Sequence, residues 1–330
     1  MNMESELMKV IKITEIEGFN IGNAQNLSAA TGCTVTLCKD GASGGVDVRG
    51  GAPGTRETDL LNPMNMVDKI HGVLLTGGSA FGLDAAGGVM KYLEEKNCGF
   101  DAGVTKVPIV CGAALFDLTV GKHDIRPDAA MGYMACTDSE KNNCSEGNVG
   151  AGTGATVGKI LGPQYAVKGG LGNFAIQAGN FKIGAVAAVN CLGDVIDSEN
   201  GEKVGGVLNK DKNQFLSTEE IMISKYDNQK NLFNGNTTIA AVITNASLTK
   251  SQANKIASMA HNGMARAIRP AHTMFDGDTI FVMGNGNIDT DISTAGFLAA
   301  YAMEKAIISA VKNTDGLYGY KCYKDIINKR

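Results

Sequence analysis

Short apolar runs bounded by glycine and asparagine turns constrain the fold of this chain more than any other feature. Each run has the length of a strand and is too short for a buried helix. Four of them lie at residues 32–37, 71–76, 107–115 and 278–283. Polar or glycine-rich segments separate the runs, and helices are predicted singly or in pairs between them. The pattern indicates a layered α/β protein in which helices cover sheets, without a regular βαβ alternation.

Local signals predict three helices and one hairpin. The helices cover residues 83–96, 249–269 and 293–312. Ser247 or Thr249 caps the second helix, and Thr249 precedes Gln252 by three residues, which is the spacing of a capping box. The hairpin joins residues 174–177 to residues 181–190 through a Gly179-Asn180 turn.

Glycine is unusually frequent, at 43 of 330 residues, which is about twice the usual share. The glycines are spread through apolar runs, and this predicts many tight turns and close backbone approaches. Charged residues make up only 19% of the chain, against about 25% in an average protein. So low a charged fraction predicts much buried surface and a homo-oligomer.

Charge and cysteine patterns argue against several classes of protein. The formal net charge is −4 and no basic block is present, so no nucleic-acid partner is predicted. No apolar stretch reaches the length of a membrane span and the N-terminus lacks a signal-peptide pattern, which predicts a cytoplasmic protein without a membrane partner. The eight cysteines form no C-x-x-C pair, and the four histidines lack ligand spacing relative to them. Reduced cysteines and no bound metal are therefore predicted.

Two glycine-rich loops, at residues 76–82 and 150–159, invite a phosphate-binding interpretation. The first lacks the G-x-G-x-x-G spacing of a dinucleotide-binding turn. The second would need glycine at position 153 and serine or threonine at position 160, where the chain has Thr153 and Ile160. No cofactor is therefore predicted.

A threonine at the start of an apolar run is the first candidate for catalysis. Gly235 and Asn236 form a turn-like pair, and Thr237 opens a predicted strand that continues to Thr244. A threonine hydroxyl is a weak nucleophile unless a base lies beside it, and cleavage of the preceding bond would make its own α-amine that base. The alternative is an ordinary loop entering a strand, because threonine is enriched in strands.

Four further polar residues are candidates, each with a plain structural alternative. Lys159 lies in a glycine-rich and apolar stretch, where spacing alone favours a lysine at an edge over a buried functional cation. Asp276 and Asp278 precede a predicted strand, and they can orient an amine or form a common Asp-Gly turn. Asn190 ends an apolar strand, and its amide can donate to an oxyanion or form an Asx-turn.

Together these motifs resemble a known family over nearly the whole chain. The most specific are the run from Arg49 to Glu57 and the turn before Thr237. The other matching runs are Gly18–Gly22, Thr31–Val35, Leu75–Leu83, Gly147–Ala155 and Val242–Ala246. The pattern is similar to the L-aminopeptidase/D-amidase-esterases, the β-aminopeptidases and the nylon-oligomer hydrolase. These are self-processing hydrolases with an N-terminal serine or threonine nucleophile.

The resemblance implies a fold and a division of the chain. The implied fold is a single αββα sandwich of four layers over residues 1–330, as in other N-terminal-nucleophile hydrolases and shared with ornithine acetyltransferases. Self-cleavage between Asn236 and Thr237 would give the fragments 1–236 and 237–330. Because relatives are oligomers of such cleaved units, a tetramer of cleaved heterodimers is expected.

The resemblance also implies a role for each candidate residue. Thr237 matches the nucleophile, Asn190 a residue that helps hold the oxyanion, and Lys159 a catalytic-site lysine of the threonine-nucleophile members. Asp276 and Asp278 match a pair that orients the nucleophile and its amino group. The implied function is hydrolysis of a small peptide or amide through an acyl-enzyme.

One position departs from the family pattern. Some members carry Tyr-Asp where this chain has Phe116-Asp117, so the amine recognition of the aminopeptidases does not carry over directly. Two alternatives to the hydrolase stay open. One is an acyltransferase of the ornithine acetyltransferase type, and the other is an unprocessed, catalytically silent member of the family.

Overall fold

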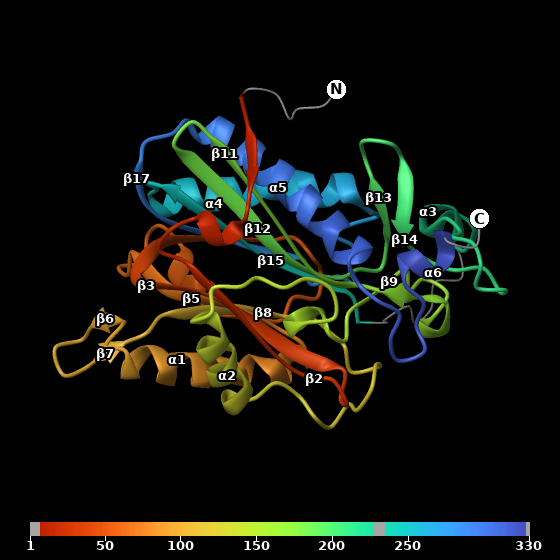
Figure 1. Ribbon diagram of the computed structural model, residues 1–330, viewed down its shortest axis with the longest axis horizontal. Coiled ribbons are helices and arrows are strands. Elements are labelled where there is room, and N and C mark those ends of the chain that lie inside the picture. Colours follow the sequence, from red (N-terminus) through yellow and green to blue (C-terminus); the bar gives the residue numbers. More distant parts are fainter. Residues whose placement is uncertain (1–6, 227–234, 328–330) are drawn as a thin grey trace.

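The apolar runs form the strands of one hydrogen-bonded sheet of ten strands, folded into two facing layers (Figure 1). The computed structural model describes residues 7–226 and 235–327. The strands of the main sheet are β1 (Lys9–Ile11), β2 (Asn20–Asn26), β3 (Thr31–Val48), β4 (Thr55–Arg56), β5 (Lys69–Thr76), β8 (Val110–Ala114), β11 (Gly170–Ala178), β12 (Phe181–Asn190), β15 (Thr237–Ala246) and β17 (Thr279–Ile288). Their order is β1-β11-β12-β15-β17-β3-β5-β8-β4, and β2 pairs with β3.

Helices and small sheets complete the described part of the chain. The α-helices are α1 (Ala85–Glu95), α2 (Ala129–Ser139), α3 (Thr218–Ser224), α4 (Lys250–Ala267), α5 (Ile292–Lys312) and α6 (Tyr323–Ile327). The short strands are β6 (Phe100–Asp101), β7 (Lys106–Val107), β9 (Thr156–Val157), β10 (Val167–Lys168), β13 (Asp194–Asp197), β14 (Glu202–Gly205) and β16 (Ile268–Arg269). They form the small sheets β6-β7, β9-β10 and β14-β13-β16.

Strand β3 belongs to both layers of the main sheet. Its residues 31–37 pair with β2 on one side, and residues 33–37 pair with β5 on the other. Its residues 43–48 pair antiparallel with β17. The pairing with β5 shifts register between Leu37 and Ala42, where Gly41 has a φ of +75°, a conformation that glycine adopts without a steric penalty. The strand therefore carries the chain from one sheet layer to the other.

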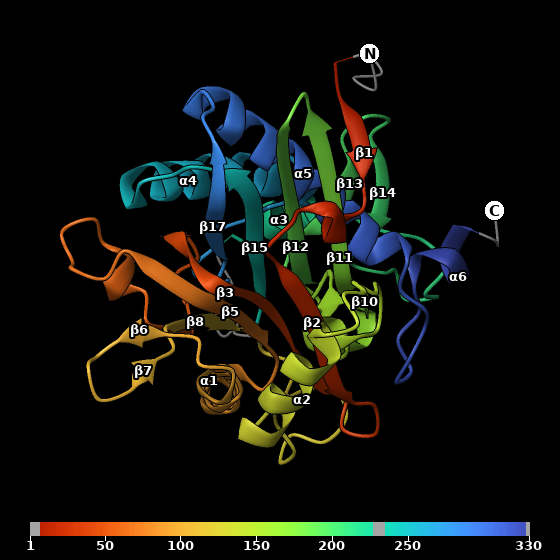
Figure 2. The same ribbon diagram turned by 60° about the vertical axis from the view of Figure 1, so that its left-hand side comes forward.

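Apolar side chains alternate between the two faces of each layer, as strand geometry requires. In β15, Ile239, Ala241 and Ile243 face the core between the layers, which also contains Val73 and Leu75 of β5. The intervening residues of β15 pack with α4 and α5, and the outer face of the other layer packs with α1 and α2. Figure 2 shows the two helix pairs on opposite sides of the sheets. The predicted four-layer αββα sandwich is confirmed.

Most predicted elements coincide with observed ones. The predicted hairpin is β11 and β12, and the capping box of Thr249 and Gln252 begins α4. Helix α2 was not predicted. In the described part of the chain one helix, α5, is long and apolar enough to cross a membrane, but 72% of its most apolar window is buried inside the structure. This burial is what a core helix of a folded domain shows.

Candidate active site

Strand pairing brings Asn190 and Thr237 side by side. Asn190 is the last residue of β12 and Thr237 is the first residue of β15, and the two are direct partners in the antiparallel register. Both side chains are buried. The end of one apolar strand and the start of the next therefore meet at one point of the sheet, although they are far apart in the sequence.

The carbonyl oxygen of Asn236 accepts two hydrogen bonds at this point. One comes from the hydroxyl of Thr237, and the other from the backbone N–H of Gly277 at 3.1 Å. Gly277 can approach this closely only because it lacks a side chain, since a Cβ there would lie 2.8 Å from Thr237 Oγ1. The peptide bond between Asn236 and Thr237 thus has a hydroxyl and a backbone donor directed at its oxygen.

Lys159 is buried and contacts Asn190 and Gly235, so the interpretation of Lys159 as an edge residue is wrong. Its Nζ donates to the backbone oxygen and the Oδ1 of Asn190, both at 2.8 Å, and to the carbonyl of Gly235 at 3.2 Å. Burial lowers the pKa of Lys159 to about 7, because a charged ammonium is disfavoured in an apolar interior.

The amide of Asn190 is held on both of its ends. Its Oδ1 accepts the backbone N–H of Thr156 at 2.9 Å, in addition to the ammonium of Lys159. Its Nδ2 donates to the carbonyl oxygens of Phe116 at 2.9 Å and Gly235 at 3.3 Å. A network of this kind fixes the direction in which the N–H bonds point, and no Asx-turn is involved.

Asp278 is directed at the strand that carries the nucleophile candidate. Its Oδ1 accepts the backbone N–H of Thr238 at 2.8 Å. Its Oδ2 accepts the backbone N–H of His272 at 3.0 Å and lies 2.9 Å from the Nδ1 of the same residue. All of these contacts are short, so the carboxylate is held in a single orientation.

Asp276 is buried beside Asp278. Its Oδ2 accepts from the backbone and the hydroxyl of Thr273, at 2.9 and 2.5 Å. Its Oδ1 is buried and has no hydrogen-bond partner among the described residues. Burial and the neighbouring Asp278 carboxylate both raise the pKa of Asp276 above its usual value.

The glycine-rich run that starts at Arg49 clamps this segment. The backbone N–H of Arg49 donates to the carbonyl of Asp278, and the backbone N–H of Ala52 donates to the carbonyl of Asp276. A Cβ on Gly50 would lie 2.2 Å from the oxygen of Asp276. The most specific motif of the sequence therefore has a clear structural task, which is to hold the two aspartates against β15.

The structure brings together all five predicted site residues, Thr237, Asn190, Lys159, Asp276 and Asp278, with the predicted cleavage residue Asn236. Sequence reasoning missed His272 and Thr273, which hold the aspartates. It also missed two buried charges nearby, Asp117 and Lys168. Of these four residues, only Asp117 had a signal in the sequence, because Phe116-Asp117 stands where some family members carry Tyr-Asp.

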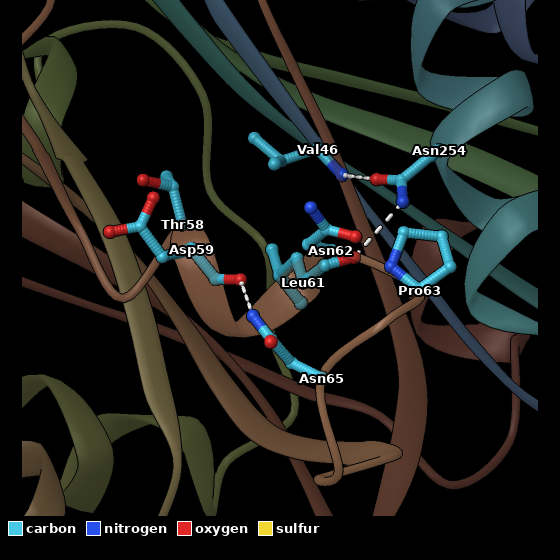
Figure 3. A pocket seen from close by; sticks show the side chains of 8 residues that line it. All are labelled: Val46, Thr58, Asp59, Leu61, Asn62, Pro63, Asn65 and Asn254. Atoms are coloured by element: carbon cyan, nitrogen blue, oxygen red, sulfur yellow. Dashed lines mark hydrogen bonds between the residues drawn. The ribbon is translucent and has the colours of Figure 1, made fainter.

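A small cavity of about 110 Å³ opens beside Thr237. It is lined by Ala52, Pro53, Gly54, Ser79, Ala80, Ala114, Phe116, Gly235, Asn236, Thr237 and Phe275. A larger pocket of about 550 Å³, lined by residues such as Asp59, Asn62 and Asn254, contains none of the predicted site residues (Figure 3). Within residues 7–226 and 235–327, no three histidine, cysteine or acidic side chains gather as a metal site would require.

The chain has the fold of the N-terminal-nucleophile hydrolases. The L-aminopeptidase D-Ala-esterase/amidase from Ochrobactrum anthropi, described as a variant of the N-terminal-nucleophile hydrolase fold, matches with a TM-score of 0.66 and 16% identity over 92% of this chain and 86% of that chain. A Pyrococcus horikoshii protein matches with a TM-score of 0.70 and 20% identity over 98% and 95%. The protein thus has the fold of this class.

The family follows from the sequence. The model of Peptidase family S58 matches residues 12–323, and the chain belongs to this family. An uncharacterized aminopeptidase of Mycobacterium tuberculosis is 38% identical over 95% of this chain and 97% of its own length. A 6-aminohexanoate-oligomer endohydrolase of Kocuria is 27% identical over 90% and 85%. The protein is therefore an amide hydrolase of the peptidase and amidase type.

Proposed function

We propose that this protein is a self-processing amide hydrolase whose nucleophile is the hydroxyl of Thr237. Cleavage of the bond between Asn236 and Thr237 would give the fragments 1–236 and 237–330. One observation carries the proposal. The Thr237 hydroxyl and the Gly277 N–H both donate to the carbonyl oxygen of Asn236, inside a buried site.

Cleavage would proceed through an ester. Thr237 Oγ1 attacks the carbonyl carbon of Asn236, the C–N bond breaks, and the hydroxyl proton is transferred to the departing nitrogen. That nitrogen becomes the α-amine of Thr237, and water then hydrolyses the ester and restores the hydroxyl. The Gly277 N–H lies where negative charge develops on the oxygen, which supports its role as an oxyanion donor. Lys159 and Asn190 hold the preceding carbonyl, that of Gly235.

The same groups would serve the substrate after cleavage. Departure of the new C-terminus frees Asn190 Nδ2 and Lys159 Nζ from the carbonyl of Gly235. The amide of Asn190 can then donate to a substrate oxyanion, a contribution of about 10²–10³ in rate for one such donor. The α-amine of Thr237 takes the hydroxyl proton and returns it to the leaving amine. Oδ1 of Asp276, which has no hydrogen-bond partner among the described residues, is the acceptor that we assign to this amine.

The substrate that we propose is a small peptide or amide. The relatives named above, an aminopeptidase and a 6-aminohexanoate-oligomer hydrolase, support this class. The described wall of the cavity consists largely of small or apolar residues, such as Ala80, Ala114 and Phe275, so a short and uncharged acyl group fits best. Alanine, β-alanine and 6-aminohexanoate p-nitroanilides, each with a free and an acetylated amine, would rank the candidates by kcat/KM.

Intact-mass measurement tests the proposal directly. The purified wild-type chain should give two species, the smaller one beginning at Thr237. Thr237→Ala should stay as one chain and be inactive, whereas Thr237→Ser retains a hydroxyl and should still be cut. A wild-type chain that remains whole, or a Thr237→Ala chain cut at the same bond, would show that Thr237 is not the nucleophile.

A further inference from the structure

Two buried charged residues outside the proposed catalytic set are connected to the amide of Asn190. They are Lys168 in β10 and Asp117, which follows Phe116. Both side chains are buried, and neither has a role in the chemistry described above. Burying a charged side chain is costly unless it is well hydrogen-bonded, so their presence calls for a specific explanation.

Lys168 binds the peptide group that holds one end of the amide. Its Nζ donates to the carbonyl oxygen of Ala155 at 2.6 Å and to that of Thr153 at 3.0 Å. The carbonyl of Ala155 and the N–H of Thr156 belong to the same planar peptide unit. That N–H donates to Oδ1 of Asn190 at 2.9 Å. The ammonium of Lys168 therefore fixes the orientation of the Thr156 N–H, and this N–H in turn holds Oδ1 of Asn190.

Asp117 anchors the chain beside the carbonyl that accepts from the other end of the amide. Its Oδ2 accepts the hydroxyl of Thr31 and its Oδ1 accepts the N–H of Gly78, both at 2.7 Å. The carboxylate thereby anchors the chain immediately after Phe116, whose carbonyl accepts from Nδ2 of Asn190 at 2.9 Å.

The two anchors also lie close to each other. A Cβ on Gly154 would come within 2.7 Å of the Cβ of Asp117, so Asp117 packs against the loop that Lys168 binds. The Asp117 carboxylate favours the charged form of Lys168, while burial lowers the pKa of that lysine to about 7.

We propose that Lys168 and Asp117 are positioning residues, which aim the N–H bonds of the Asn190 amide at the carbonyl oxygen under attack. This inference rests on the proposed function, in which Asn190 donates to the oxyanion. Because hydrogen bonds to an oxyanion act on the transition state, a misdirected amide lowers kcat and leaves KM nearly unchanged.

A double-mutant cycle on protein confirmed to be cleaved tests the inference. Lys168→Met should lower kcat about 10- to 10²-fold with little change in KM. In an Asn190→Ala background the same substitution should change kcat by less than about twofold, because the group that Lys168 positions is already gone. Asp117→Asn, which keeps the shape of the side chain, should follow the same pattern with a smaller loss.

Lys250 supplies a matched control. It is also buried, and its Nζ donates to three backbone carbonyls, those of Leu60, Asn65 and Val67, outside the site. Lys250→Met should keep the wild-type kcat even where it lowers the melting temperature. An equal loss of kcat in Lys250→Met, or a full loss from Lys168→Met in the Asn190→Ala background, would overturn the inference.

A second measurement separates this inference from the proposed function. The side-chain amide signals of Asn190 in a ¹H–¹⁵N spectrum, identified by their absence in Asn190→Ala, need neither cleavage nor activity. In Lys168→Met they should shift or broaden, and in Lys250→Met they should stay unchanged. If the wild-type chain proves uncleaved, the proposed function fails, and unchanged Asn190 signals in Lys168→Met would then refute the positioning role by themselves.

Discussion

Gly277→Ala should slow self-cleavage without unfolding the protein. Gly277 does not have a left-handed φ, so alanine can adopt its backbone conformation. The added Cβ would lie 2.8 Å from Thr237 Oγ1 and 2.9 Å from the carbonyl of Ala52. The carbonyl belongs to the clamped backbone, so the side chain of Thr237, whose Cγ2 would also lie 3.2 Å from the new Cβ, is the group that moves.

The size of the effect follows from these distances. Ordinary contact begins at 3.4 Å, so the hydroxyl has to retreat by about 0.6 Å from its present position. A displacement of about 1 Å in an active site costs on the order of 10²-fold in rate. We therefore expect cleavage to slow by about 10- to 10²-fold, equivalent to about 1.4–2.7 kcal/mol. Overpacking costs about 1–3 kcal/mol of stability, less than the total of about 5–15 kcal/mol for a domain.

The assay is a time course of intact mass after synthesis, beside a thermal unfolding curve. Gly54→Ala is the matched control, because Gly54 lines the same cavity and its Cβ would lie 3.8 Å from the nearest atom, in ordinary contact. This control should be cut at the wild-type rate. A folded Gly277→Ala chain that is cut as fast as Gly54→Ala would refute the assigned position of the attacking hydroxyl.

Three further predictions concern charge and assembly. On cleaved protein, Lys159→Met removes a positive charge near the Thr237 α-amine, so the apparent pKa of hydrolysis should rise and the rate should fall; an unchanged pH–rate profile would leave Lys159 as a packing residue only. Burial and Asp278 raise the pKa of Asp276, so ionised Asp276 destabilises the native state. In the uncleaved Thr237→Ala chain, the free energy of unfolding with Asp276→Asn, relative to that without it, should therefore increase as pH rises from about 4 to 7. Urea denaturation of these two uncleaved chains at both pH values checks this, and a constant difference would contradict it. Light scattering at micromolar concentration should give a multiple of the protomer mass, as the low charged fraction predicts, and a single protomer mass would exclude the tetramer.

Elements with local signals could be predicted from the sequence. The capping box of Thr249 and Gln252 begins α4 because both of its hydrogen bonds lie within four residues of chain. Helix α2 has a capping residue, Asp128, which accepts the N–H of Met131. It was missed because small residues such as Gly132 and Ala135 make up much of its buried face, so no apolar period marks the helix. It packs closely on β2, where a Cβ on Gly22 would lie 2.1 Å from the carbonyl of Ala135. That contact joins distant parts of the chain, and no local period reveals it.

The site residues also divide into those with a local sequence signal and those held by contacts between distant parts of the chain. The strand ends that carry Asn190 and Thr237 could be predicted, because each follows or opens an apolar run. The burial of Lys159 could not, since its acceptors lie 31 and 76 residues away in the sequence. Lys168 was missed for the same reason. A lysine that binds two backbone carbonyls of another loop looks, in the sequence, like any other lysine.

The position of β15 and β17 in the middle of the sheet sets an order of events for making this protein. Their outer neighbours are β12 and β3, so a cut before Thr237 would assign adjacent strands to different fragments. The smaller fragment alone would have two unpaired strand edges with apolar faces, which favour aggregation, and the larger would lack the centre of its sheet. If the chain is cut as proposed, folding has to precede cleavage, and the two fragments produced from separate genes should fail to assemble. The bond before Thr237 would then be needed while the chain folds and dispensable afterwards, so denaturation of the cleaved protein should be irreversible.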